Sequence, residues 1–374
     1  MYPLPTRTDG PRRHPGRAAA AAALVGLAFA CSPSGGADGD APRSFGLSRA
    51  DQASGTQALL QAVSAVSPQV VWVSGHEGTW GRTLDGGGTW VTSVMAGADS
   101  LQFRDVDAFD ERTAYLMSAG AGALSRIYKT VDGGASWELQ FLNEHPDGFL
   151  DCMSFWDQDR GLAYGDSVDG VLFVLRTEDG GENWTLVEGD SLPLAQEGEG
   201  GFAASGSCVD TAPGGAAWIA TGNADVARVL RTEDYGLTWS VAEVPVDGGP
   251  GGGLTTVGFP DGHWGFALGG IIGNDTVRSR NVAASGDGGR TWLEGGRLAM
   301  TGPVYGAALV PDLPLPTVFA VGPGGADWSP DGGRTWRSAD PRTFWAVAFA
   351  SQEAGWAVGP EGRITRFGFQ TGGG

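Results

Sequence analysis

Aspartates are the residues of this chain whose type and spacing could support catalysis. Cleavage of a glycosidic bond needs two carboxylates that face each other across a cleft. Five aspartates lie on or beside predicted strands: Asp105, Asp107, Asp151, Asp166 and Asp169. The last two belong to segment 166–170, for which a plain Asp-Gly turn is the favoured interpretation. A glycoside hydrolase, sialidase-like or other, that uses these carboxylates is therefore the alternative interpretation and not the first.

Other catalytic chemistry lacks the residues it would need. The histidines are scattered, with no pair at the spacing of a zinc site: His14, His76, His145 and His263. The sequence has no strand–Gly-x-Gly-x-x-Gly–helix unit for a dinucleotide and no nucleophile elbow. We therefore predict no catalytic residue, no metal and no cofactor.

A repeated turn motif must position any site on this chain. Six copies of Ser/Thr-x-Asp-x-Gly-x-Thr/Ser-Trp, or a close variant, follow one another at spacings of 44–55 residues. In each copy the carboxylate can accept backbone N–H groups just downstream, and glycine supplies the positive φ of a tight hairpin. The tryptophan begins the return strand, where its ring can bury against the neighbouring sheet. The structural residues of the six copies are Asp85, Trp90, Asp132, Trp137, Asp179, Trp184, Asp234, Trp239, Asp287, Trp292, Asp331 and Trp336.

Each turn belongs to a unit of four short predicted strands. Segments 103–109, 114–118, 126–130 and 137–141 alternate apolar and polar residues, which is typical of a propeller blade. Segments 345–349, 355–359 and 362–367 match the first three strands of a seventh unit that lacks its turn and fourth strand. We predict that the segment beginning at Ser44 supplies the missing outer strand. The result is one all-β, seven-bladed propeller over residues 44–369 with a shared closing blade, followed by a disordered tail at 370–374.

The six copies resemble the Asp-box (bacterial neuraminidase, BNR) repeat, and their regular spacing is most similar to the propellers of the photosystem II stability/assembly factor type. The resemblance covers residues 44–369 and implies a propeller of the sialidase superfamily, in an exported bacterial protein. Sialidase activity would further require a Phe-Arg-Ile-Pro-like element near the N-terminus, which this sequence lacks. The box itself is a structural turn, so the resemblance implies the fold more strongly than any activity.

Segments that interrupt the repeat mark one face of the predicted ring as the candidate site. Extra residues occur at 143–147, 198–205 and 271–281, and insertions confined to particular blades tend to build one face. We expect a site at the mouth of the central channel. Its candidate binding residues are Arg104, Asp105, Asp151, Asp166, Arg280 and Tyr305. The preferred function is non-catalytic binding of a protein or glycan partner, as in a factor that helps a complex to assemble or remain stable.

The first 30 residues predict an export signal. Four arginines precede an apolar run at 18–30, which is too short for a transmembrane helix. Cys31 follows Ala28-Phe29-Ala30 and resembles the lipidated cysteine of bacterial lipoproteins, although Ala28 and Phe29 depart from that pattern. Simple cleavage that leaves a free cysteine is the alternative. Residues 31–43 would then form a flexible tether. We expect a cell-envelope lipoprotein, periplasmic or anchored in the outer membrane, that touches the membrane only through its lipid. If Cys31 carries no lipid, we expect a secreted protein.

Charge and the remaining cysteines limit the partners and the redox state. Without residues 1–30 the formal net charge changes from −19 to −22, and such a surface repels phosphate backbones. We expect no nucleic-acid partner, and a monomer. Cys152 lies 13 residues before Gly165 whereas Cys208 lies 14 before Gly222, and this odd difference could point the two side chains to different faces. We therefore expect two buried free thiols, with a disulfide left open because an exported protein permits one.

Overall fold

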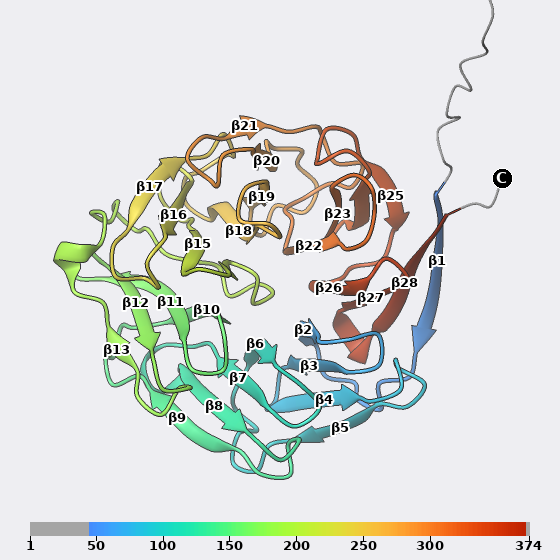
Figure 1. The fold of residues 1–374 in the computed structure, drawn as a ribbon, viewed down its shortest axis with the longest axis horizontal. Coiled ribbons are helices and arrows are strands. Elements are labelled where there is room, and N and C mark those ends of the chain that lie inside the picture. The colour runs from blue at the N-terminus through green and yellow to red at the C-terminus, as the bar shows by residue number, and fades with distance from the viewer. Residues whose placement is uncertain (1–44, 372–374) are drawn as a thin grey trace, which may run out of the picture. The chain divides into compact units, whose positions relative to one another are not determined.

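Seven four-stranded antiparallel sheets surround a central channel in the computed structural model, which describes residues 45–371 (Figure 1). The predicted signal peptide, Cys31 and the tether lie outside the described residues. In blades 1 to 6 the chain runs from the innermost strand to the outermost strand, and in blade 7 it runs from the innermost strand to the third. Three 3-10 turns complete the described secondary structure: η1 (Gly122–Leu124), η2 (Gly189–Ser191) and η3 (Pro360–Gly362).

The strands occupy equivalent places in successive blades. The innermost strands of blades 1 to 7 are β2 (Leu60–Ala65), β6 (Phe103–Ala108), β10 (Leu150–Phe155), β14 (Val209–Ala212), β18 (Gly252–Gly258), β22 (Gly306–Val310) and β26 (Ala346–Ser351). The second strands are β3 (Val71–Gly75), β7 (Ala114–Ser118), β11 (Gly161–Val168), β15 (Ala216–Ala220), β19 (Gly265–Ile271), β23 (Thr317–Gly322) and β27 (Ala354–Val358). The third strands are β4 (Thr79–Thr83), β8 (Arg126–Thr130), β12 (Val171–Thr177), β16 (Arg228–Thr232), β20 (Val282–Ser285), β24 (Gly325–Ser329) and β28 (Ile364–Thr371). The outer strands are β5 (Val91–Val94), β9 (Glu138–Leu142), β13 (Thr185–Leu186), β17 (Ser240–Glu243), β21 (Leu293–Glu294), β25 (Arg337–Asp340) and, in blade 7, β1 (Phe45–Gln52).

The ring closes through the N-terminal strand, as predicted. Strand β1 pairs antiparallel with β28 over its whole length, from Phe45 opposite Thr371 to Gln52 opposite Ile364. The Gln52 side-chain oxygen accepts N–H bonds from the indoles of Trp356 in blade 7 and Trp90 in blade 1, both at 3.1 Å. Gln52 therefore joins the closing blade to the first blade, and pairing of β1 covers the edge that β28 would otherwise expose.

All six Asp turns share one hydrogen-bond pattern. The Ser or Thr hydroxyl two residues before the Asp donates to its carboxylate at 2.8–2.9 Å. The same carboxylate oxygen accepts the N–H four residues after the Asp, also at 2.8–2.9 Å. Bonds from the side chain and backbone of Ser136 lower the pKa of Asp132 to about 2. Every turn lies between a third and a fourth strand, so these aspartates shape the outer part of the blades and do not face the channel.

The tryptophans of the turns help to pack one blade against the next. Trp137 of blade 2 packs edge-on against Trp72 and Trp80 of blade 1, with ring centroids 6.2 and 5.4 Å away. Trp90 and Trp292 are buried, but the other four turn tryptophans are only partly buried. The prediction of buried rings therefore holds fully for two of the six positions.

Candidate binding site at the channel mouth

A loop between blades 3 and 4 reaches into the central channel and lines part of it (Figure 1). We call residues 199–207, the last part of the connection between β13 and β14, the plug loop. Its base is fixed by Glu199, whose buried carboxylate accepts bonds from Arg228 and from the Thr221 hydroxyl at 2.8 Å. Gly200 and Gly222 then exchange two backbone hydrogen bonds of 3.0 and 2.9 Å. The insertion predicted at 198–205 is thus an ordered structural element.

The plug loop reaches three other blades. Its Ala203 carbonyl accepts a bond from Arg104 Nη1 of blade 2 at 3.1 Å. Its Gly201 N–H donates to Asp166 Oδ1 of blade 3 at 3.2 Å, and the Ser205 hydroxyl donates to the Tyr305 carbonyl beside blade 6 at 2.8 Å. The loop therefore brings together candidate residues that lie far apart in the sequence.

A disulfide holds the end of the plug loop. Cys208 follows the loop directly and is bridged to Cys152 on β10, with both side chains buried. The expectation of free thiols is wrong. It counted Cys152 from Gly165 and Cys208 from Gly222, and these two glycines do not occupy equivalent positions in their blades. Cys152 lies opposite Tyr164, and the Cys208 carbonyl accepts the Ala220 N–H. The residue of blade 4 that matches Gly165 is thus Thr221 and not Gly222, and the two cysteines occupy the same position in adjacent blades.

Arg104 lines the mouth, and the buried Asp151 lies near it. Arg104 donates to Gln102 through Nε at 3.0 Å and Nη2 at 2.5 Å, in addition to its bond to Ala203. Burial lowers its pKa, and the nearby Asp151 carboxylate opposes that shift. Asp151 is 2% exposed, and its Oδ2 atom has no hydrogen-bond partner among the described residues. Burial and repulsion from Asp166 raise the pKa of Asp151 well above its usual value.

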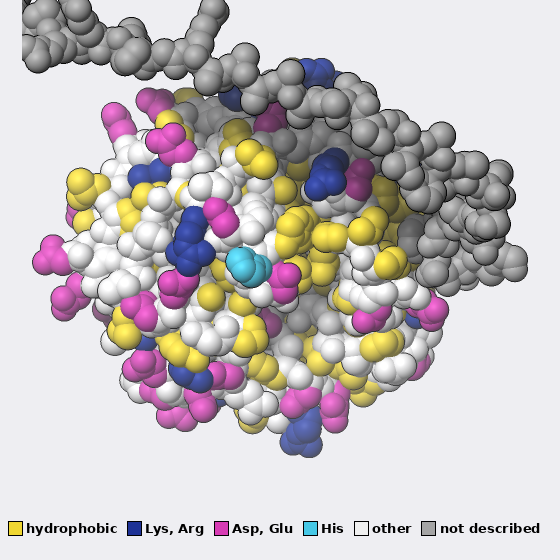
Figure 2. Space-filling model, turned by 45° about the horizontal axis from the view of Figure 1, so that its top comes forward, with side chains coloured by type: hydrophobic (Ala, Val, Ile, Leu, Met, Phe, Trp, Pro, Cys, Tyr) yellow, Lys and Arg dark blue, Asp and Glu magenta, His cyan; other side chains and the backbone are white. Residues whose placement is uncertain are grey.

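A small apolar pocket opens beside Arg104. It has a volume of about 120 Å³ and is lined by Phe202 to Ala204 of the plug loop, Ile272, Tyr305 and Trp345. The rings of Tyr305 and Trp345 lie 4.7 Å apart between centroids, and both remain partly exposed. An oblique view of the molecule shows hydrophobic side chains gathered beside a hollow near its middle, with many acidic side chains over the surrounding surface (Figure 2).

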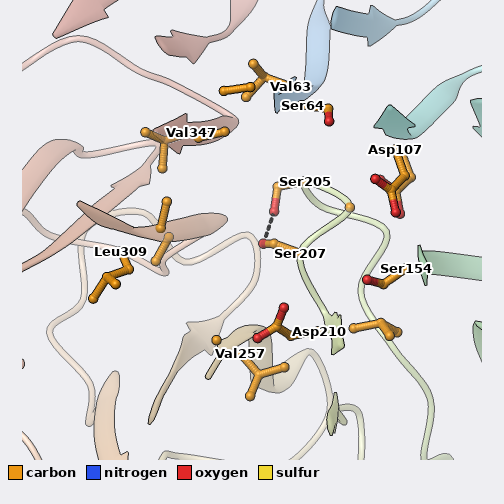
Figure 3. Close-up of a pocket in the computed structure, with 18 of the residues that line it drawn as sticks. Val63, Ser64, Asp107, Ser154, Ser205, Ser207, Asp210, Val257, Leu309 and Val347 are labelled. Carbon is orange, nitrogen blue, oxygen red and sulfur yellow. Dashed lines mark hydrogen bonds between the residues drawn. The ribbon is translucent and has the colours of Figure 1, made fainter. Parts of the chain in front are cut away.

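The channel beneath the plug loop forms a second and larger cavity of about 340 Å³ (Figure 3). Ser205 and Ser207 of the plug loop, whose hydroxyls are 2.7 Å apart, line part of its wall. One repeated inner-strand position lines the wall with polar side chains in blades 1 to 4: Ser64, Asp107, Ser154 and Asp210. Its equivalents in blades 5 to 7 are Gly258, Ala308 and Ala348. The channel is therefore polar on one side and apolar on the other.

The channel carboxylates have a structural task at this repeated position. Asp107 Oδ2 accepts the Phe155 N–H of blade 3 at 3.1 Å, and Asp210 Oδ2 accepts the Phe259 N–H of blade 5 at 2.6 Å. Asp105 does the same for Met153 at 2.7 Å. Burial raises the pKa of both Asp107 and Asp210 to about 6, and raises that of Asp105 well above its usual value. Two carboxylates of raised pKa thus line one cavity, and each also ties its blade to the next.

The structure separates the remaining candidates from the mouth. Arg280 pairs with Asp247 at 2.7 Å in a different depression, lined by residues of blade 5 and its loops. Asp169 and Gly170 form a two-residue turn with φ of 52° and 78°, so the Asp-Gly turn interpretation holds for these two residues. Asp166 is instead on β11, where it holds the plug loop. Arg104, Asp151, Asp166 and Tyr305 lie around the mouth, whereas Asp105 lines the cavity beneath it.

Of the four large apolar side chains of the site, only Tyr305 was predicted from the sequence. Trp345 stands at the start of a segment recognised as an inner strand, and Tyr305 holds the matching place in blade 6, so alignment of the units could have paired them. Alignment could likewise have placed Asp210 with Asp107. Nothing in the sequence indicates that Phe202 and Ile272 meet them, because both side chains come from loops whose paths depend on the assembled ring.

Residues 45–371 contain neither a candidate metal site nor a helix that could cross a membrane. No cluster of three or more His, Cys, Asp or Glu side chains in this range is arranged to hold a metal ion. No helix within the same residues is long and apolar enough to cross a membrane.

Comparisons with known proteins identify the architecture. No protein-family model and no curated protein matches the chain. Among solved structures it is similar to YCF48 bound to a D1 peptide, with a TM-score of 0.59 and 18% identity over 86% of this chain and 96% of that one. YCF48 from Cyanidioschyzon merolae gives 0.59 and 17% over 86% and 98%, and the WD40 propeller domain of Doa1 gives 0.56 and 14% over 87% and 97%. At these identities the likeness concerns the fold alone: the chain is an all-β, seven-bladed propeller.

Proposed function

We propose that this chain is a non-catalytic propeller of the cell envelope that binds a protein partner at the channel mouth, as an assembly or stability factor would. The observation that carries the proposal is the partly exposed apolar pocket beside Arg104. Aromatic residues and arginine are the side chains most often found at the energetic centre of protein interfaces. The six Asp turns fit Asp-box repeats, and one similar propeller has been solved with a bound peptide.

The disulfide of the chain fits an exported location. Disulfides persist mainly in oxidising compartments, and Cys152 and Cys208 are bridged. We propose that residues 1–30 are a signal peptide and that Cys31 carries the lipid. Mass spectrometry of the mature N-terminus tests this: a lipid-modified Cys31 is expected, and an intact Met1 would contradict export.

Affinity capture from an envelope extract tests the proposed function. The baits are wild type, a Tyr305→Ala/Trp345→Ala variant and, as the matched control on a charged group outside the pocket, Arg280→Gln. Wild type and the control should recover a common protein partner that the double variant loses, with all three baits showing equal thermal stability. Recovery of the same partners by every bait would show that the mouth is not the binding face.

Glycoside hydrolysis is the second candidate, and the two channel carboxylates favour it. Asp107 and Asp210 line one cavity, and the pKa of each is raised to about 6. A hydrolase needs one protonated and one ionised carboxyl group, whereas burial raises the pKa of both these groups alike and each accepts a backbone N–H. Incubation with a panel of sialylated and neutral glycans decides between the functions. Turnover that disappears in Asp107→Asn or Asp210→Asn, without loss of folding, would replace the binding proposal.

A further inference from the structure

The mouth pocket has the size of one side chain and not of a whole ligand. Its volume of about 120 Å³ is well below the roughly 300–1,000 Å³ of clefts that enclose a drug-sized molecule. Four partly exposed apolar side chains form its wall: Phe202, Ile272, Tyr305 and Trp345. An occupant of this pocket would therefore be one apolar side chain that projects from a larger partner.

The pocket is pre-formed, because the backbones that carry its rings are fixed. The Tyr305 N–H donates to the Val321 carbonyl at 2.8 Å, and the Trp345 N–H donates to the Val358 carbonyl at 2.7 Å. The Phe202 ring packs on Gly222 so closely that a Cβ atom on this glycine would lie 2.3 Å from it. Binding to such a rigid pocket costs little ordering entropy, which favours even a short peptide.

Arg104 is the only charged side chain that lines this pocket among residues 45–371. Three of its N–H groups are used by Gln102 and Ala203, so two of the five that a guanidinium offers are left for a ligand. The protein as a whole is strongly acidic, with a formal net charge of −19, so complementarity to an anion is confined to the immediate surroundings of Arg104. This positive point beside an apolar pocket is complementary to a carboxylate, whereas a basic peptide would meet the wrong charge here.

We infer that the mouth recognises a peptide segment in which an apolar side chain is followed directly by a carboxylate. This inference rests on the proposed function and names the chemistry of its partner. The apolar side chain enters the pocket between Tyr305 and Trp345, and the carboxylate accepts hydrogen bonds from Arg104. A second copy of this chain is the other occupant that the test distinguishes.

Fluorescein-labelled hexapeptide amides titrated with full-length protein test the inference by anisotropy. The reference peptide contains Gly-Leu-Glu-Gly, and its matched relatives replace Leu by Ser, or Glu by Gln or Lys. The reference should bind measurably below 1 mM, and each replacement should weaken binding about tenfold, as for loss of one charge-assisted contact or one buried side chain. Raising the salt concentration should weaken the Glu peptide more than the Gln peptide.

Variants assign each contact. Arg104→Lys keeps the charge but loses the planar fork, so it should reduce the preference for Glu over Gln. Tyr305→Ala should reduce the preference for Leu over Ser, and Arg280→Gln should bind like wild type. Because Arg104 also holds the plug loop, a thermal melt accompanies each variant, and Tyr305→Ala still tests the pocket if the Arg104 variant does not fold.

Three results would overturn the inference. Equal or tighter binding of the Lys peptide would refute the charge complementarity. Concentration-dependent self-association that Tyr305→Ala abolishes would assign the pocket to a second copy. Absence of binding by every peptide, while capture of a protein partner still depends on Tyr305 and Trp345, would refute the recognition chemistry and leave the proposed function intact. If no peptide binds and capture of the protein partner also does not depend on Tyr305 and Trp345, both the inference and the proposed function are refuted.

Discussion

Removal of the Cys152–Cys208 disulfide is expected to destabilise the propeller strongly. The bridge spans 56 residues of sequence, and it restricts the unfolded chain by closing a loop of that length. The chain-entropy relation gives about 4 kcal/mol at 25 °C for such a loop. The bridge also joins two adjacent blades where the plug loop ends, so the same change should loosen the channel mouth.

Urea unfolding followed by tryptophan fluorescence measures this effect. The comparison is between oxidised wild type, Cys152→Ala/Cys208→Ala and wild type kept reduced throughout. The reduced wild type retains both sulfur atoms, so it separates loss of the covalent bond from loss of buried volume. Both altered proteins should unfold at clearly lower urea than oxidised wild type.

A thiol titration provides the independent check. Denatured, unreduced wild type should show no reactive thiol from Cys152 or Cys208. Reactive thiols at both positions, or equal urea midpoints for the three proteins, would refute the bridge and with it the chemical support for an oxidising compartment.

Three further predictions concern packing, closure and pH. Trp137→Ala should cost about 2–3 kcal/mol, less than the ~3–5 kcal/mol typical of fully buried aromatic residues, because this ring is only partly buried; chemical denaturation measures it. Gln52→Ala should cost about 1–3 kcal/mol, since two indole N–H groups lose their acceptor; if the cost were negligible, ring closure would not depend on this residue. Asp107 and Asp210 have folded pKa values of about 6, above the ~3.9 of an unfolded aspartate, so their contribution is fully present below about pH 4 and is lost as the pH rises through 6. Asp107→Asn/Asp210→Asn should therefore flatten the decline of stability between pH 4 and pH 7, and an unchanged pH profile would contradict the burial of these carboxyl groups.

The repeat made the architecture predictable from the sequence. Asp132 and its five counterparts recur with a tryptophan five residues later, and this local pattern is independent of the rest of the fold. The unit after Phe344 lacks its outer strand, and the strand that begins at Phe45 belongs to no other unit. These two segments are therefore expected to pair, and β1 does pair with β28.

The site was predictable only in part. Arg104, Asp151 and Tyr305 were predicted because they stand at or beside the inner strands of repeat units, whose ends surround the channel mouth. The path of the plug loop depends on Glu199, which is buried against Arg228, and no local signal indicates that pairing. The disulfide was missed for a similar reason: Gly222 stands one residue beyond the true equivalent of Gly165, and strand pairing resolves this one-residue shift.

Site-specific photo-crosslinking tests the central claim that the mouth is the partner-binding face. A benzophenone amino acid replaces Ile272 at the pocket or, as a control on the rim, Leu139, which is 46% exposed on β9. In cells that make the protein, irradiation should yield a discrete protein adduct from position 272 and none from position 139. An adduct from position 139 together with none from position 272 would contradict the account.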